Sequence, residues 1–334
     1  MAERFLAIKP SSFGDIIHLF PALDVLKKAF PDAVLDFVVN PEFAPLLEFS
    51  PFPVENIICF ERRKLAEFPG CVPEFFKLRS RLRREKYDAV IDFQGLFRSG
   101  VCSFMTGSSL RCGFAHPREA AAAWFYNRKV ALEPMHAVER CVRLVEGIFS
   151  LERCENIVYP ELPVSASGKA GLPQLPEKYM VLLPGTRWES KQFPPALFAG
   201  VIREMKKVFP EMGFVIAGGK GERALGDVIG TGSINLAGKT SRPALFELLR
   251  GAEAVLGNDS GPLHAAAALR RPVFGFYGPT EPGLTGPWGE DSMPLSNHAE
   301  CAGCLKRVCP LEKVLCHDIT PETVVEKICR KLQQ

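Results

Sequence analysis

Short apolar runs alternate with longer amphipathic segments along most of the chain, and the two patterns predict different elements. In the first half, short apolar runs without helical spacing predict buried strands. Strands of this kind, separated by helices, are typical of a parallel sheet that is covered on both faces. The predicted strands are Phe5–Ile8, Val34–Val39, Ile57–Phe60, Ala89–Phe93 and Leu110–Phe114.

Several segments between these runs have apolar residues at every third or fourth position. They predict helices over Ile16–Phe30, which ends before Pro31, over Glu119–Tyr126 and over Ala137–Phe149. The polar stretch Pro10–Asp15 predicts a turn between the first strand and the first helix.

The stretch over residues 160–176 has no apolar period and is rich in Pro, Gly, Ser and Ala, which is typical of a linker. Beyond it the alternation starts again, with a helix predicted over Pro195–Phe209. Thr320 and Pro321 then open a last helix. Strands of this second half are predicted at Met180–Leu183, Phe214–Ala217, Ile234–Leu236, Ala254–Leu256 and Val273–Tyr277.

The sequence therefore predicts an α/β protein with two Rossmann-like parallel-sheet domains. We expect an N-terminal domain over residues 1–159, a linker over 160–176, a C-terminal domain over 177–319 and a final helix over 320–334. The carboxyl edges of the two sheets are expected to face a central cleft.

Composition adds few constraints. The 334 residues are 47% hydrophobic and 24% charged, as in an ordinary globular protein, and the net charge of +3 gives no indication of a nucleic-acid partner. No apolar run approaches the length of a membrane span, and no signal-peptide core is present. Most of the eleven cysteines lie singly in apolar segments, which favours reduced thiols. We expect a cytoplasmic location, with docking on a membrane surface left open.

One strand-to-helix junction carries the strongest chemical signal. The run Ala254–Leu256 leads through Gly257–Gly261 into an Ala-rich segment that predicts a helix. Such a junction places N–H groups and the positive end of a helix at the carboxyl edge of a sheet, where anions bind. Beside an anion, Asp259 suits the hydroxyl groups of a sugar, while Ser260 caps the helix. The alternative is that both are helix caps only.

Three further positions of the second half carry candidate chemistry. In the loop Gly185–Lys191, Thr186 and Lys191 suit the diphosphate of a leaving group. His264 is either a packed core residue or a ligand contact. No Asp-x-Asp sequence occurs, so the commonest metal-holding motif of nucleotide-sugar enzymes is absent.

Asp15 is the candidate base of the first half. A carboxylate after the first strand can take a proton from an incoming hydroxyl if burial raises its pKa toward neutrality, against the influence of the helix N-terminus. The alternative is a first-turn acid that complements the helix dipole.

The basic segment Phe75–Tyr87 has Phe75, Leu78 and Leu82 on one helical face and two stripes of Lys and Arg beside it. With the basic residues Arg62–Lys64, it suits an anionic membrane surface or a phosphorylated glycolipid. The alternative is a solvated helix face.

A compact cysteine run, C-x2-C-x4-C-x6-C, lies near the C-terminus between two histidines. Only its first pair has the spacing of a zinc knuckle, so a structural zinc site is a secondary hypothesis and packed thiols are the alternative. Neither interpretation makes these residues catalytic. The four are Cys301, Cys304, Cys309 and Cys316.

Taken together, these stretches resemble the bacterial ADP-heptose:lipopolysaccharide heptosyltransferases, glycosyltransferase family 9. The resemblance rests on KPSSFGDIIHLFPAL, YDAVIDFQGLFRSG, REAAAAWFYNRKV with HAVER, GNDSGPLHAAAAL and YGPTEPGLTG. REAAAAWFYN and YGPTEPGLTG look most like the heptosyltransferase I group, which adds the first heptose to the Kdo region of the inner core. The cysteine run instead resembles the heptosyltransferase II group, so an already heptosylated or different acceptor is the alternative.

The resemblance implies a GT-B fold and metal-independent, inverting transfer of L-glycero-D-manno-heptose from ADP-heptose, without a cofactor. It implies that Asp15 is the base and that Arg118, with Ser12 and Gly14, binds the acceptor. That acceptor is a Kdo-lipid A or inner-core glycolipid, met at the cytoplasmic face of the inner membrane. The implied donor site comprises Thr186, Lys191, Asp259, Ser260, Gly261 and His264.

Overall fold

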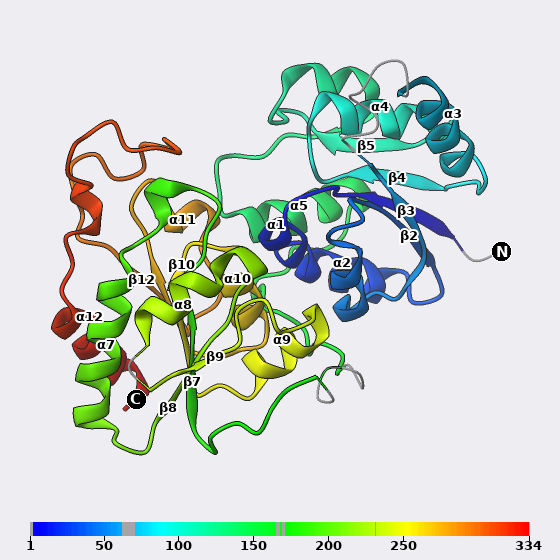
Figure 1. Ribbon diagram of the computed structural model, residues 1–334. Coiled ribbons are helices and arrows are strands. Elements are labelled where there is room, and N and C mark those ends of the chain that lie inside the picture. Colours follow the sequence, from blue (N-terminus) through cyan, green and yellow to red (C-terminus); the bar gives the residue numbers. More distant parts are fainter. Residues whose placement is uncertain (1–2, 62–70, 165–167, 169–170, 231, 334) are drawn as a thin grey trace. The chain divides into compact units, whose positions relative to one another are not determined.

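The structure is a computed structural model that describes residues 3–61, 71–164, 168, 171–230 and 232–333. It divides into two compact units, residues 1–163 and 164–334, which are shown in Figure 1 and are described separately below. The basic residues Arg62–Lys64 and part of the predicted linker lie outside the described residues.

The first unit is a parallel sheet of six strands in the order β3-β2-β1-β4-β5-β6. Its strands are β1 (Arg4–Ile8), β2 (Val34–Val39), β3 (Val54–Cys59), β4 (Ala89–Asp92), β5 (Arg111–Phe114) and β6 (Arg128–Val130). Its helices are α1 (Phe13–Ile17), α2 (Phe20–Ala29), α3 (Cys71–Leu82), α4 (Phe97–Met105) and α5 (Ala137–Phe149), with 3-10 segments η1 (Ala44–Phe49) and η3 (Ala120–Phe125).

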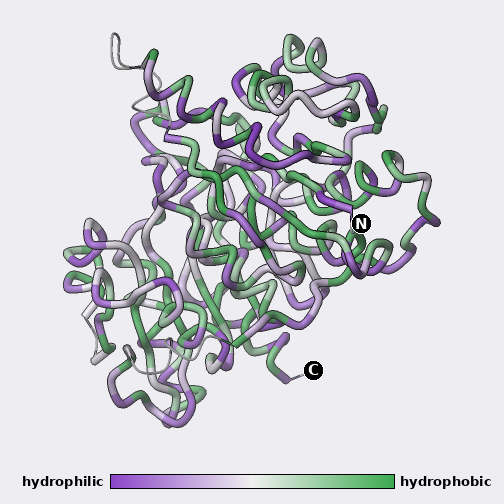
Figure 2. Tube along the Cα trace, turned by 90° about the vertical axis from the view of Figure 1, so that its right-hand side faces the viewer, coloured by the Kyte–Doolittle hydropathy of each residue, from purple (hydrophilic) through white to green (hydrophobic). Residues whose placement is uncertain are grey.

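Helices cover both faces of this sheet. On one face, the ring of Phe5 in β1 contacts Phe30, directly after α2, and Phe149, the last residue of α5, at 5.1 and 5.4 Å between ring centroids. On the other face, Leu6 of β1 belongs to a core cluster with Leu82 of α3. Successive residues of one strand therefore face opposite helical layers, as a doubly covered parallel sheet requires. Figure 2 shows hydrophobic segments running through the interior of the trace.

The first predicted helix differs from the observed one. Instead of one helix over Ile16–Phe30, helix α1 begins at Phe13 and a turn at His18 and Leu19 separates it from α2. Pro21 explains the break, because it has no N–H to donate to a carbonyl in the preceding turn. The predicted helix over Glu119–Tyr126 is likewise only the 3-10 segment η3.

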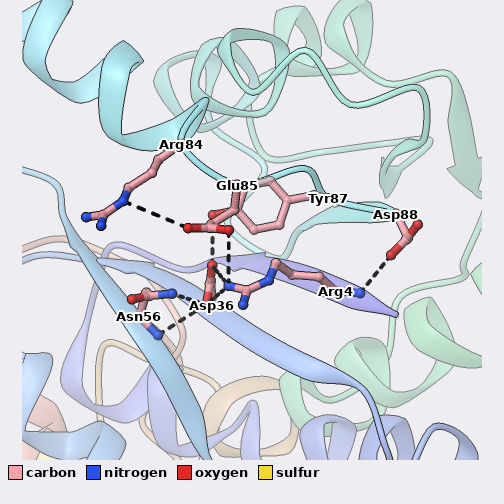
Figure 3. Close-up of polar contacts among 7 residues, drawn as sticks. All are labelled: Arg4, Asp36, Asn56, Arg84, Glu85, Tyr87 and Asp88. Atoms are coloured by element: carbon pink, nitrogen blue, oxygen red, sulfur yellow. Dashed lines mark hydrogen bonds and ion pairs between the residues drawn. The ribbon is translucent and has the colours of Figure 1, made fainter. Parts of the chain in front are cut away.

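A buried polar network joins four segments on the amino side of this sheet (Figure 3). Asp36 of β2 is fully buried and accepts hydrogen bonds from the Arg4 guanidinium at 2.9 and 3.2 Å and from the Tyr87 hydroxyl at 3.0 Å. The backbone N–H and side-chain amide of Asn56 also donate to it, both at 3.1 Å. The network anchors Tyr87, and with it the segment that follows α3, to the sheet.

The second unit repeats the architecture, with the strand order β12-β11-β10-β7-β8-β9 and all pairs parallel. Its strands are β7 (Tyr179–Leu183), β8 (Gly213–Ile216), β9 (Ile234–Asn235), β10 (Ala254–Asn258), β11 (Val273–Phe276) and β12 (Ser292–Leu295). Its helices are α7 (Pro195–Val208), α8 (Arg223–Ile229), α9 (Arg242–Arg250), α10 (Gly261–Ala268), α11 (Pro282–Thr285) and α12 (Pro321–Leu332), with 3-10 segments η4 (Glu189–Lys191), η5 (Lys220–Glu222) and η6 (Leu315–His317).

The core of the second unit is densest where α7 and α12 pack together against the sheet. Phe198 of α7, Phe276 of β11 and Ile328 of α12 are fully buried members of one cluster. Thr320 caps α12 as predicted, accepting a hydrogen bond from the Thr323 N–H at 3.3 Å. Within the described residues, none of the helices is long and apolar enough to span a bilayer.

Candidate active site

Each sheet has one place where the strand order reverses. In the first unit this switch point lies between β1 and β4, and in the second between β7 and β10 (Figure 1). Open α/β sheets bind their ligands at such a point, beyond the carboxyl ends of the strands. Most of the predicted site residues follow one of these four strands.

Asp15 lies in the first turn of α1, just after β1. Ser12 is the N-cap of this helix, and its N–H and its hydroxyl both donate to Asp15 Oδ2, at 2.8 and 2.6 Å. The predicted turn over Pro10–Asp15 thus ends at Ser12, because Ser12 and Asp15 form a capping box that starts the helix. The Asp15 side chain is 45% exposed and so remains accessible to a ligand.

The surroundings keep the Asp15 carboxylate ionised. Burial acts to raise its pKa, but the Lys9 ammonium, 3.8 Å from Oδ1, and the two hydrogen bonds from Ser12 lower the pKa to about 2. The expectation that burial raises the pKa of Asp15 toward neutrality is therefore wrong. The nearby cation and the hydrogen bonds together outweigh desolvation.

Lys9, which the sequence analysis did not single out, ties the two strands of this switch point together. Its side chain is buried and its Nζ donates to the Phe93 carbonyl, just after β4, at 3.1 Å. The Ser11 N–H similarly donates to Gln94 Oε1 at 3.2 Å. These two bonds fix the loop that carries Asp15.

Asp92 is a second residue that sequence reasoning missed. It is fully buried at the end of β4, where its carboxylate accepts the N–H groups of Gln94 and Gly95, at 2.8 and 3.2 Å, and the Tyr126 hydroxyl at 2.6 Å. Burial raises the pKa of Asp92. Asp92 thereby joins the loop after β4 to the end of η3.

Arg118 is exposed in the loop between β5 and η3. Because β5 is the neighbour of β4, this loop leaves the same carboxyl edge as the loop of Asp15. Gly95 has φ of +67°, and a Cβ there would lie 3.3 Å from the backbone nitrogen of Arg118, so the loop after β4 closely contacts the loop after β5. Ser12 at the N-cap of α1 and Gly14 in its first turn lie beside Asp15, and Arg118 lies at the same edge of the sheet.

Asp259, directly after β10, is the centre of the second site. Its carboxylate is 8% exposed, and Oδ2 accepts Lys191 Nζ and the Thr280 hydroxyl, both at 2.6 Å. His264 Nε2 lies 3.8 Å from Oδ1. Burial acts to raise the pKa of Asp259, but His264 and Lys191 hold it well below its usual range.

These contacts differ from the role predicted for Asp259. The sequence suggested a carboxylate available to sugar hydroxyls, whereas the structure surrounds it with Lys191, Thr280 and His264. The sequence does not show this arrangement, because Lys191 and Asp259 lie far apart in the chain and meet only where β7 and β10 pair. Asp259 is placed to hold the Lys191 ammonium.

Lys191 and Thr186 both lie in the loop that follows β7. Lys191 is 14% exposed, and its Nζ lies 4.4 Å from the centroid of the Trp188 ring. The Thr186 hydroxyl donates to the Asp259 carbonyl at 3.1 Å. The loops after β7 and β10 are thus joined by one ion pair and one hydrogen bond.

Ser260 is at the N-cap of α10, but its side chain makes no capping hydrogen bond. The predicted capping by its hydroxyl is therefore wrong, and in the described part of the chain the buried Ser260 Oγ has no hydrogen-bond partner. Buried hydroxyls without partners are uncommon in native proteins. Gly261 is the first residue of α10, and His264 is buried one turn further on.

Glu222 is a third residue that the sequence analysis did not identify. Its Oε2 accepts the Gly219 N–H at 2.7 Å, and burial raises its pKa. A Cβ at either Gly185 or Gly218 would overlap its carboxylate. The carboxylate therefore lies between the loops that follow β7 and β8, where only glycine leaves room.

The cysteine run is not arranged as a metal centre. Over the described ranges, no group of three or more His, Cys, Asp and Glu side chains could hold a metal ion. Cys301 and Cys304 are exposed, Cys309 is half-buried and Cys316 is buried, and all four are free thiols. Burial, with a contribution from the other three thiols, raises the pKa of Cys316. The zinc hypothesis gains no support from this geometry.

Comparison with known proteins covers both units. Residues 75–315 match the model of glycosyltransferase family 9 (heptosyltransferase). The chain is 33% identical over 323 residues to lipopolysaccharide heptosyltransferase 1 of Pseudomonas aeruginosa, covering 92% of this chain and 87% of that protein. It is 32% identical over 301 residues to lipopolysaccharide heptosyltransferase 1 of Escherichia coli strain K12, covering 87% and 92%.

A solved structure shows the same similarity. The E. coli heptosyltransferase WaaC with ADP superposes with a TM-score of 0.80 at 27% identity, covering 98% of this chain and 99% of that one. These findings confirm the family and the two-sheet α/β fold that the sequence indicated. The chain belongs to glycosyltransferase family 9, the heptosyltransferases, and is an enzyme of that family.

Proposed function

We propose that the protein transfers L-glycero-D-manno-heptose from ADP-heptose to the Kdo region of the lipopolysaccharide inner core. The similarity to two heptosyltransferases 1 supports this donor and this acceptor. The observation that carries the proposal is the second switch point, where a buried carboxylate holds Lys191 beside the N-terminus of α10. A cation, an unpartnered hydroxyl and a helix N-terminus are what a diphosphate requires.

In this proposal the donor lies on the second unit. Lys191 and the Ser260–Gly261 helix start bind the diphosphate, and the Ser260 hydroxyl gains a hydrogen-bond partner that the described residues do not give it. Thr186 and His264 line the same place. Glu222 takes the ribose hydroxyls, as an acidic side chain at the end of the second strand does in related nucleotide sites; its Oε2 is already used by Gly219, which leaves Oε1 for the ligand.

The transfer itself is a single displacement that inverts the anomeric carbon. The acceptor hydroxyl oxygen attacks that carbon, its proton passes to Asp15, and the bond to the β-phosphate oxygen breaks so that ADP leaves with the electron pair. Lys191 stabilises the charge that develops on ADP. Ser12, Gly14 and Arg118 contact the acceptor, Arg118 through its Kdo carboxylate or phosphate groups.

A base with a pKa of about 2 is weak but always ionised at neutral pH. Lys9 and the two hydrogen bonds from Ser12 cause the low pKa, so Asp15 accepts the proton only once bond formation to the anomeric carbon has made the attacking hydroxyl strongly acidic. General bases work best when their pKa approaches the working pH.

The reaction is proposed to need no metal or other cofactor, because Lys191 and α10 supply the positive charge at the diphosphate. Turnover measured after exhaustive dialysis against EDTA should equal that of untreated protein. Loss of activity that Mg²⁺ or Zn²⁺ restores would contradict this part of the proposal.

A second candidate is transfer to an already heptosylated acceptor, which the cysteine run favours. The deciding experiment measures ADP release from ADP-heptose with no acceptor, with Kdo2-lipid A and with its mono-heptosylated form. Release that depends on Kdo2-lipid A supports the main proposal. Release only with the heptosylated acceptor selects the alternative, and no release with either overturns both.

The cytoplasmic face of the inner membrane is the proposed location, and the first unit offers a surface for it. On α3 and the residues just after it, a surface hollow is lined by Phe76 and by arginines from Arg79 to Arg84. Phe104 of α4 is 58% exposed and Trp124 of η3 is 79% exposed. Exposed aromatic rings beside arginines suit the interface of an anionic bilayer. Helix α3 ends at Leu82, so the last basic residues of the predicted stripes follow the helix rather than lie on it.

Flotation with vesicles tests this surface without any acceptor. We expect binding to vesicles that contain phosphatidylglycerol and little binding to phosphatidylcholine alone. Because one surface charge is worth about 1 kcal/mol, Arg79→Glu with Arg84→Glu should weaken binding by roughly 25-fold or more. Lys178→Glu with Lys207→Glu, which changes the same charge on exposed positions of the second unit, is the control. Equal losses in the two double variants would rule this surface out.

A further inference from the structure

The segment Cys301–His317, which carries the cysteine run, contacts the loop of Lys191. Ser190, the neighbour of Lys191, is buried and makes three hydrogen bonds to this segment. Its N–H donates to the Arg307 carbonyl at 3.1 Å, its hydroxyl donates to the Lys306 carbonyl at 2.6 Å, and its carbonyl lies 2.9 Å from His317 Nε2. The N–H and the carbonyl of Ser190, next to Lys191, are therefore both bonded to the cysteine-bearing segment.

The same segment also holds the loop after β11. The N–H groups of Gly303 and Leu305 donate to the carbonyls of Gly278 and Pro279, both at 2.8 Å. A Cβ at Gly278 would overlap the side chain of Cys316, so only glycine lets this thiol pack against the loop. The next residue of that loop, Thr280, donates to Asp259. One segment thus fixes both loops that supply partners of Asp259.

His317 is the most specific contact of the segment. A backbone carbonyl can only accept, so the Nε2–H of His317 donates to Ser190. The imidazole also packs on the ring of Phe193, at 4.2 Å between centroids, and Phe193 in turn stacks on Phe276 of β11. Burial lowers the pKa of His317, so the ring is neutral at pH 7, and one N–H is all that this bond requires.

We propose that the cysteine-bearing segment positions Lys191 for the donor diphosphate, and that His317 is a positioning residue acting through Ser190. The inference rests on the proposed function for the identity of the ligand, but the contacts themselves stand without it. It gives a role to a motif that neither the zinc hypothesis nor the reaction explains. The buried Cys316 thiol packs the segment against the loop after β11, and the histidine and the carbonyls of Lys306 and Arg307 hold η4.

Two variants separate the hydrogen bond of His317 from its packing. His317→Phe keeps a ring against Phe193 but removes the donor, whereas His317→Gln keeps an N–H donor at similar reach. Loss of one such bond should weaken ADP binding about tenfold, measured by titration calorimetry, while His317→Gln should stay within about threefold of the parent protein. His298→Gln, an exposed histidine at the other end of the run, is the matched control and should change nothing.

A double-mutant cycle tests whether the effect passes through Lys191. In a Lys191→Ala background, His317→Phe should weaken ADP binding no further, because the group that it positions is gone. An equal tenfold loss in that background would overturn the inference, and so would unchanged ADP affinity in the single variant.

Amide hydrogen exchange, measured without added nucleotide, keeps this test separate from the proposed function. The peptide containing Ser190 should exchange faster in His317→Phe than in the parent protein. Losing the bond to the Ser190 carbonyl frees this backbone, so the bond from the Ser190 N–H to the Arg307 carbonyl opens more often. If the parent protein binds no ADP, the donor proposal fails, but the exchange result still decides whether His317 holds the backbone at Ser190. Unchanged exchange at Ser190 would overturn this positioning role of His317 even if ADP binds well.

Discussion

Each switch point pairs a carboxylate with a lysine, but the two pairs differ in burial and in distance. At the first, the Asp15 carboxylate is 45% exposed and its cation, Lys9, is buried 3.8 Å away. At the second, Asp259 is 8% exposed and Lys191 lies 2.6 Å from it. An accessible carboxylate can meet an incoming hydroxyl and take its proton. A buried carboxylate held by three side chains can only orient them, so in the second unit the cation is the group available to a ligand.

A third carboxylate shows that burial alone does not mark a site. Asp36 is as buried as any group in the molecule and also pairs with a cation, Arg4. It lies toward the amino side of the sheet, and its partners Asn56 and Tyr87 come from neighbouring segments of the fold (Figure 3). Position at the carboxyl edge therefore separates Asp15 and Asp259 from Asp36.

The largest expected effect is that of Asp15→Asn. Removing the base should lower turnover by about 10²–10⁴-fold, while ADP affinity stays close to that of the parent protein. The thermal midpoint should fall somewhat, because the ionised Asp15 carboxylate pairs with Lys9 in the folded protein. Steady-state kinetics with calorimetry measure this, with Asp32→Asn, an exposed acid after α2, as the control. Turnover near that of the parent protein would remove Asp15 as the base.

Lys191→Ala should have the next largest effect and a different profile. We expect kcat/KM for the donor to fall by about 10²–10³-fold with weaker ADP binding, because the cation stabilises ADP both bound and leaving. The KM for the acceptor should not change. Lys207→Ala, a solvent-exposed lysine of α7, is the control. An unchanged donor KM and ADP affinity would leave the diphosphate without this partner.

The sequence predicted the site better at the level of loops than of contacts. Because carboxyl ends of parallel strands share one edge, the loops carrying Asp15, Lys191 and Asp259 could be identified from the strand pattern alone. Contacts between distant segments could not. Thr280 and Glu222 gave no local signal, and the pairing of Lys191 with Asp259 depends on how β7 and β10 align.

The fold shows the same limit. The predicted bounds of β2 and α5 agree with the structure, because a continuous apolar run and a strong amphipathic period define them. The sequence did not predict β6 (Arg128–Val130) or β12 (Ser292–Leu295). Both are short edge strands; β6 has two charged residues and β12 contains Pro294, so neither carries an apolar pattern.

Asp36→Asn tests whether the third carboxylate stabilises the fold without taking part in the reaction. The substitution leaves the Arg4 guanidinium beside a neutral partner in this network. This should lower the free energy of unfolding by about 3 kcal/mol, measured by urea denaturation. The kcat of the folded fraction should not change. Glu326→Gln, which breaks the fully exposed pair with Arg330, is the control and should cost under about 0.5 kcal/mol. A loss of kcat at equal folded fraction would place Asp36 in the chemistry.

The smallest expected effect tests why Asp15 remains ionised. In the parent protein, kcat/KM should stay flat as the pH falls from 8 to about 4, because activity that needs the ionised carboxylate is lost only as the pH passes through its pKa of about 2. Ser12→Ala removes the hydroxyl that donates at 2.6 Å and so raises this pKa, which moves the acid limb to higher pH. Stability should change in the same direction. The lowered pKa of Asp15 stabilises the folded protein at pH values above 3.8, the pKa of the unfolded chain, and this stabilisation is lost as the pH falls toward 2. Ser12→Ala should therefore lose part of this stabilisation.

Ser11→Ala is the matched control, because the contact of Ser11 with Gln94 uses its N–H and not its side chain. An acid limb unmoved by Ser12→Ala would assign the low pKa to Lys9 and the Ser12 N–H, and the Ser12 hydroxyl would then have only a structural role.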